Sequence, residues 1–138
     1  MESALRVLVL EDEWLIATQI AAALERSGHR VIGPFASVQH AEETIQAGEL
    51  DAALLDVRLA EGHSFAVADA CLEAGIPFAF VTGVGSVDLP VLFASCPILR
   101  KPFSEAALVA QIQSLAGEAP SRSAAPCQNE PGSDASAR

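Results

Sequence analysis

Residues 52–59 read Ala-Ala-Leu-Leu-Asp-Val-Arg-Leu, in which a short apolar run, Ala52–Leu55, is followed directly by an acidic residue, Asp56. Continuous apolar runs of this length are typical of a strand buried on both faces, as in the centre of a parallel sheet. Ligands of open parallel sheets gather at the carboxyl ends of the strands. The stretch therefore predicts a central strand at Ala52–Leu55 and places Asp56 where chemistry is expected.

Working outward, strands and helices alternate along the chain. Short apolar runs predict four more strands, at Arg6–Leu10, Arg30–Ile32, Pro77–Thr82 and Ile98–Leu99. Apolar periodicity and capping signals predict helices from about Ile16 to Gly28, from Ser37 to Ala47, over Phe65–Glu73 and from Ser104 to Gly117, with a short, poorly defined helix at Pro90–Ala94. The alternation predicts an α/β fold, a three-layer sandwich whose parallel sheet is covered on both sides.

Composition limits the size and the partners of the protein. The 138 residues suit one domain, and 51% of them are apolar. A net charge of −10 with no basic cluster argues against nucleic-acid binding. No apolar run approaches the roughly 20 residues that span a bilayer, and no signal pattern opens the chain, so we expect no membrane contact and a cytoplasmic location. We expect one domain at residues 1–117 and a disordered tail at residues 118–138, which lacks periodicity.

Charged and polar side chains follow four of the predicted strands. They are Glu11-Asp12-Glu13 after the first, Asp56 after the third, Thr82 at the end of the fourth and Lys101 after the fifth. Carboxylates brought together repel one another, and a hard cation such as Mg²⁺ relieves that repulsion. One carboxylate can then attack phosphorus, while a hydroxyl and an ammonium hold the phosphoryl oxygens. Lys101 is the only lysine in the chain, which suggests that its compact charge is needed.

Four motifs in this order resemble the receiver domain of two-component response regulators: LVLEDE (Leu8–Glu13), LLDVRL (Leu54–Leu59), FVTG (Phe80–Gly83) and RKPF (Arg100–Phe103). The resemblance covers about residues 6–117. It implies a flavodoxin-like (CheY-like) fold with a five-stranded parallel sheet of order 2-1-3-4-5.

The resemblance also implies the role of each site residue. Asp56 is the expected phosphorylation site, Thr82 the switch hydroxyl and Lys101 the phosphate-binding lysine. Mg²⁺ is expected on the carboxylates of Glu11, Asp12 and Asp56 and on the backbone carbonyl of Arg58. The implied function is that of a single-domain response regulator, which accepts a phosphoryl group from a histidine kinase or phosphotransfer protein. Such a module is not an independent enzyme, and it either signals to an unknown downstream protein or acts as a phosphate sink.

A narrower resemblance concerns residues 80–85, Phe-Val-Thr-Gly-Val-Gly, which are similar to the signature of the FATGUY subgroup of receivers. This subgroup implies a kinase of the HWE type. Ile98 stands where typical receivers carry the aromatic residue of the switch, a departure that the subgroup is expected to share. With Ile98 at that position, the resemblance does not imply the usual pairing of a threonine with a rotating aromatic.

For each of these residues a purely structural role also stays open. Asp56 can be a turn-capping carboxylate, the acidic cluster a solvated first turn of helix, Thr82 a plain strand residue and Lys101 a surface lysine. Two other functions also remain: a pseudo-receiver that binds partners without phosphorylation, and a haloacid-dehalogenase-like Mg²⁺ phosphohydrolase. The hydrolase needs a second aspartate where this chain has Arg58.

The histidines and the tryptophan carry weaker expectations. We expect His29 and His40 at the surface and His63 as a solvated loop residue near the site. Trp14 directly follows the acidic cluster, and we expect it to be partly exposed there.

Overall fold

The sheet has five parallel strands in the order β2-β1-β3-β6-β7, which confirms the expected fold and strand order. The computed structural model describes residues 4–60, 62–83 and 89–118. The strands of the sheet are β1 (Arg6–Leu10), β2 (Arg30–Phe35), β3 (Ala52–Asp56), β6 (Phe78–Thr82) and β7 (Ile98–Arg100).

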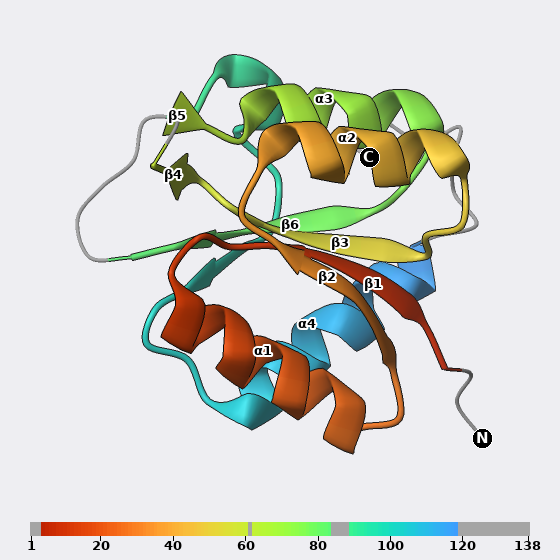
Figure 1. Cartoon of the computed structure of the whole chain (residues 1–138), viewed down its shortest axis with the longest axis vertical. Helices are drawn as coiled ribbons and strands as arrows, with labels where there is room; N and C mark the ends of the chain where they lie inside the picture. The colour runs from red at the N-terminus through yellow and green to blue at the C-terminus, as the bar shows by residue number, and fades with distance from the viewer. Residues whose placement is uncertain (1–3, 61, 84–88, 119–138) are drawn as a thin grey trace.

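Helices cover both faces of the sheet and make a three-layer sandwich (Figure 1). On one face lie α1 (Trp14–Arg26) and α4 (Glu105–Glu118), and on the other lie α2 (Val38–Ala47) and α3 (Phe65–Ala74). The expected caps are present: the hydroxyl of Ser37 accepts from His40 N, and that of Ser104 accepts from Ala107 N. No helix among the described residues is long and apolar enough to cross a membrane.

The alternation of side chains along β1 explains why the first strand is a continuous apolar run. Leu8 and Leu10 pack into the cluster under α2 and α3, whereas Val7 and Val9 pack into the cluster with α1 and α4. A strand covered on both faces needs apolar residues at every position. Its polar residues are therefore displaced to the strand ends, where the site lies.

Three parts of the structure differ from the expected elements. The segment expected to hold a short helix at Pro90–Ala94 contains only a 3₁₀ turn, η1 (Val91–Phe93), among its described residues. Strand β2 continues through Gly33-Pro34 to Phe35, because it is an edge strand and the register shift between Leu8 and Leu10 accommodates the extra residue. The loop after β3 forms a second, two-stranded antiparallel sheet of β4 (Arg58–Leu59) and β5 (Gly62–His63).

The expected domain boundary near residue 117 falls within the last turn of α4, which reaches Glu118. Residues 119–138, which were expected to form the tail, lie outside the described residues.

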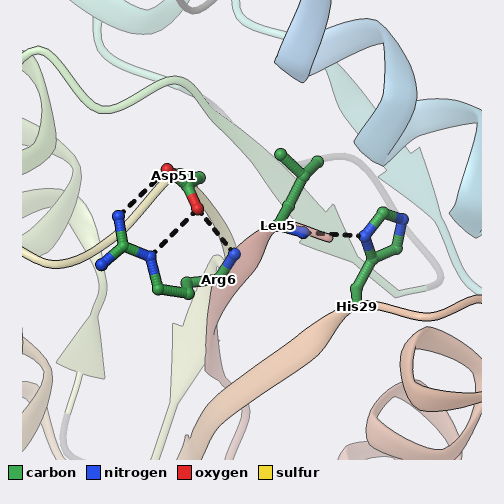
Figure 2. Close-up of polar contacts among 4 residues, drawn as sticks. All are labelled: Leu5, Arg6, His29 and Asp51. Atoms are coloured by element: carbon green, nitrogen blue, oxygen red, sulfur yellow. Dashed lines mark hydrogen bonds and ion pairs between the residues drawn. The ribbon is translucent and has the colours of Figure 1, made fainter. Parts of the chain in front are cut away.

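At the amino ends of the strands, side chains fasten β1 to its neighbours (Figure 2). The Asp51 carboxylate accepts from Arg6 N at 2.8 Å, Arg6 Nε at 3.1 Å and Arg6 Nη2 at 3.3 Å. His29 Nδ1 accepts from Leu5 N at 3.2 Å, and only 7% of the residue is exposed. The expectation of a surface His29 was therefore wrong, because the backbone N–H of Leu5 gives the imidazole a buried partner.

Replacing Asp51 is expected to destabilise the fold. Hydrogen bonds and charge from Arg6 lower the pKa of the Asp51 carboxyl, so its contribution is present above its ordinary pKa and is lost as the pH falls through the lowered value. We expect Asp51→Ala to lose about 1–2 kcal/mol of unfolding free energy at pH 7, since the carboxylate is partly solvated. Urea unfolding at pH 7 measures the loss. Asp69→Ala, at an exposed position on α3, is the control, and an equal loss in both variants would contradict the assignment.

Candidate functional site

Three carboxylates meet at the carboxyl edge of the sheet. Glu11 and Asp12 directly follow β1, and Asp56 is the last residue of β3, the neighbouring strand. The two strands pair with Leu10 opposite Leu55, so the residues that follow come side by side. Carboxylate oxygens of Glu11, Asp12 and Asp56 all lie within 4.8 Å of one another. Glu11 and Asp56 are buried, with 3% and 6% of their surface exposed.

One ammonium group lies between two of these carboxylates. Lys101 follows β7, and its Nζ is 3.0 Å from Glu11 Oε1 and 3.6 Å from Asp56 Oδ1. The ammonium of Lys101 thus compensates the charge of the buried Glu11 oxygen. The backbone N–H of Lys101 donates to Thr82 O at 2.8 Å, which fixes the lysine at the edge of the sheet.

The electrostatics of this cluster favour a protonated Asp56. Burial and the Glu11 carboxylate raise the pKa of Asp56 from 3.8 to about 7, with a smaller contribution from Asp12, and Lys101 offsets only part of the rise. At neutral pH the site therefore holds less negative charge than three ionised carboxylates would give. A further cation close to the carboxylates would offset the part of the rise in pKa that comes from Glu11 and Asp12, but not the part that comes from burial.

Two backbone N–H groups hold the carboxylates of the first motif. Glu13 N donates to Glu11 Oε2 at 3.1 Å, and Ala60 N donates to Asp12 Oδ2. Ala60 lies between β4 and β5, so Asp12 joins the end of β1 to the chain just beyond Asp56. The sequence does not predict this contact, since a backbone donor leaves no signal in residue type.

The remaining residues expected at the site lie around the carboxylates. Thr82 is buried at the end of β6, one residue beyond the partner of Asp56 in the sheet register. Among the described residues, no hydrogen bond links its hydroxyl to the charged groups. Arg58 begins β4 with an exposed side chain, and its carbonyl as a metal ligand stays a prediction. Trp14, at the start of α1, is 76% exposed, in line with expectation.

The donor set fits a hard divalent cation. Mg²⁺ binds oxygen ligands and commonly takes one or two carboxylates, with water and phosphate oxygens completing its coordination. The cluster offers carboxylate oxygens, and the single ammonium of Lys101 faces three carboxyl groups. The residues present therefore suit Mg²⁺ better than a metal that prefers nitrogen or sulfur ligands.

Comparison with known proteins identifies similar chains. No protein-family model matches the sequence. A curated relative, the transcriptional regulatory protein TcrA of Mycobacterium tuberculosis, is 30% identical over 123 residues, which are 86% of this chain and 48% of TcrA. The chain thus spans about half the length of the curated relatives it matches.

Solved structures extend the comparison. SdrG from Sphingomonas melonis Fr1 is 34% identical, covers 83% of this chain and 98% of its own, and superposes with a TM-score of 0.74. Two further structures share the fold. A response regulator receiver protein from Sinorhizobium medicae WSM419 has 23% identity and a TM-score of 0.72, and the match covers 85% of this chain and 98% of that one. The PhyR response regulator REC domain of Erythrobacter litoralis has 24% identity and a TM-score of 0.68, and the match covers 95% of this chain and 97% of that one.

The raised pKa of Asp56 predicts how the stability of the metal-free protein depends on pH. The folded state keeps the proton up to about pH 7, whereas the unfolded chain loses it near 3.8. The stability from this group is therefore complete below 3.8 and is lost as the pH rises through 7. Each unit of pKa shift corresponds to about 1.4 kcal/mol.

We expect the metal-free wild type to lose unfolding free energy between pH 5 and pH 8 relative to Asp56→Asn, which carries no titrating group. Urea unfolding in a chelating buffer measures both proteins across this range, with Asp69→Asn as control. Parallel curves for wild type and Asp56→Asn would contradict the raised pKa.

Proposed function

This chain belongs to the receiver domains of response regulators, and on that basis we propose that Asp56 accepts a phosphoryl group from a phosphohistidine donor in a Mg²⁺-dependent reaction. The observation that carries the proposal is the position of Lys101 Nζ, 3.0 Å from Glu11 Oε1 and 3.6 Å from Asp56 Oδ1. An ammonium at that place can bind an oxygen of a phosphoryl group that is joined to Asp56.

Each side chain of the site has a separate role in the phosphoryl transfer. A carboxylate oxygen of Asp56 forms the new bond to phosphorus, and the bond from phosphorus to the donor's imidazole nitrogen breaks as that nitrogen takes the electron pair. Asp56 must be ionised to attack, so the carboxyl loses its proton first. Lys101 and the Thr82 hydroxyl then hold phosphoryl oxygens, which stabilises the charge carried by the transferred group.

Glu11, Asp12, Asp56 and the Arg58 carbonyl would hold the Mg²⁺ ion. When bound, the ion supplies positive charge that lowers the repulsion among the carboxylates and the phosphoryl oxygens. The backbone N–H of Ala60 donates to Asp12 Oδ2, which orients the Asp12 carboxylate that would bind the ion. Burial of Glu11 and Asp56 keeps water away from the acyl phosphate and strengthens each charge interaction.

Phosphorylation changes the balance of charge around Lys101. The phosphoryl group adds about two negative charges and competes with Glu11 for the ammonium. We infer that Thr82 moves toward the phosphoryl group, a change that a downstream protein reads unless the domain serves as a phosphate sink. The donor is a histidine kinase, of the HWE type if the subgroup resemblance holds, or a phosphotransfer protein. The chain itself does not act as an independent enzyme.

Mass spectrometry after incubation with a small phosphodonor tests the acceptor directly. With Mg²⁺ present, we expect wild type and Asp69→Asn to gain the mass of one phosphoryl group. Asp56→Asn has no nucleophilic carboxylate and is expected to stay unmodified. Equal phosphorylation of Asp56→Asn, or none of the wild type, would contradict the proposal.

Trp14 fluorescence tests the metal site. Trp14 lies two residues beyond Asp12, so we expect Mg²⁺ to change its emission. Asp12→Asn removes a charged ligand and should weaken the apparent affinity at least about tenfold. Glu25→Gln, an exposed change at the far end of α1, is the control and should bind as wild type does. Unchanged affinity in Asp12→Asn would exclude Asp12 as a ligand.

A further inference from the structure

The small sheet of β4 and β5 is attached to the site at two points. β4 begins two residues after Asp56, and Ala60, which follows β4, donates its backbone N–H to Asp12 Oδ2. In the register of the two strands, Arg58 lies opposite His63 and Leu59 opposite Gly62. The pairing therefore connects β5 to Arg58 and to Leu59, the residue that precedes Ala60.

His63, on β5, is exposed to solvent, and its ring packs against Phe65, which in turn packs against the core. The imidazole stacks on Phe65 with ring centroids 5.0 Å apart and an interplanar angle of 9°. Phe65 in turn stacks on Phe93 of η1 at 5.8 Å and meets the edge of Phe80 at 6.1 Å. Phe80 is fully buried in the sheet. The His63 ring thus links the outer strand of the small sheet to a fixed aromatic cluster.

We propose that His63 is a positioning residue for the metal site. Its ring, stacked on Phe65, fixes the two strands so that the Ala60 N–H orients the Asp12 carboxylate and the Arg58 carbonyl faces the proposed ion. The inference deepens the proposed function and rests on it for the identity of the ion, Mg²⁺. The juxtaposition of the ring, the strand pair and the Asp12 carboxylate is observed directly and does not depend on the identity of the ion.

The size of the small sheet explains why such a support is needed. Two pairs of residues cannot hold an antiparallel ribbon in water, since even longer isolated hairpins are marginal. Burial of Leu59 anchors β4, and the N–H of Ser64, just past β5, donates to Val57 O at 3.1 Å. These contacts fix the ends of the ribbon. The stack of His63 on Phe65 fixes how the ribbon is rotated about these end contacts. This rotation determines the direction of the Ala60 N–H.

A positioning role and a charge effect of His63 predict different changes in Mg²⁺ affinity when the side chain is removed. The direction of the change therefore distinguishes the two roles. An effect of His63 through charge alone would leave Mg²⁺ binding unchanged or make it stronger when the side chain is removed. Removing a positioning ring weakens the binding, because the ligands are then less well ordered. His63→Phe separates ring from charge, as it keeps a stacking surface and carries no proton.

The experiment compares wild type, His63→Ala, His63→Phe and His40→Ala in the full chain. His40→Ala is the matched control, because it removes another exposed imidazole, one that is tilted 44° from Phe35 at 6.1 Å and lies on α2. Mg²⁺ alone is titrated against Trp14 fluorescence. We expect roughly tenfold weaker binding in His63→Ala, with His63→Phe and His40→Ala within about twofold of wild type. Urea unfolding verifies that each variant is folded under these conditions.

Hydrogen exchange of the Ala60 amide in metal-free protein gives a second readout. We expect faster exchange in His63→Ala, with protection restored in His63→Phe. If the wild type binds Mg²⁺ and gains a phosphoryl group, two outcomes overturn the inference. One is a Mg²⁺ affinity in His63→Ala equal to or tighter than that of the wild type. The other is a Mg²⁺ affinity in His63→Phe as weak as in His63→Ala. A wild type that binds no Mg²⁺ and gains no phosphoryl mass overturns the proposed function, and with it the positioning role.

Discussion

Three carboxylates held within 4.8 Å of one another, against a single ammonium, form the constraint on which the site depends. The backbone brings the residues together: β1 and β3 pair in register, and the N–H of Glu11 donates to Phe35 O at 2.9 Å, which fixes the backbone of Glu11 at the edge of the sheet. The repulsion is therefore relieved chemically, by a proton on Asp56 or by a cation. A site that exchanges a proton for a metal ion is also one in which the ionised, nucleophilic form of Asp56 depends on that ion. Under the proposed function, metal uptake would therefore be linked to readiness for phosphoryl transfer.

Much of this arrangement could be predicted from the sequence, because burial on both faces of a parallel sheet leaves polar residues only at the strand ends. The run Arg6–Leu10 places its apolar side chains alternately under two pairs of helices, and the acidic residues begin as soon as that burial ends. Asp56, Thr82 and Lys101 each follow or close a strand in the same way. The position of Lys101 next to Glu11 was not evident from the sequence, since it depends on which strands are neighbours and on a flexible side chain.

The features that the sequence did not predict share a physical cause: their partners are backbone groups or residues of very short elements. Strands of two residues, such as β4 and β5, show no periodicity. The hydrogen bond from Ala60 N to Asp12 does not depend on the alanine side chain, and the burial of His29 depends on the N–H of Leu5. The stack of His63 on Phe65 likewise needs the bend between β5 and α3, which spacing alone does not specify. In this site the carboxylates come from strand ends, and their orientation comes from the irregular chain between strands.

The central claim is that a divalent cation replaces a proton at the carboxylate cluster. Calorimetric titration of the wild type with Mg²⁺ at pH 7, repeated in buffers that differ in ionisation enthalpy, measures the number of protons released per ion. With the pKa of Asp56 at about 7, the account predicts the release of about half a proton per ion, rising at pH 6 and vanishing by pH 9. Binding without proton release at pH 6 and 7, or no binding at all, would contradict it.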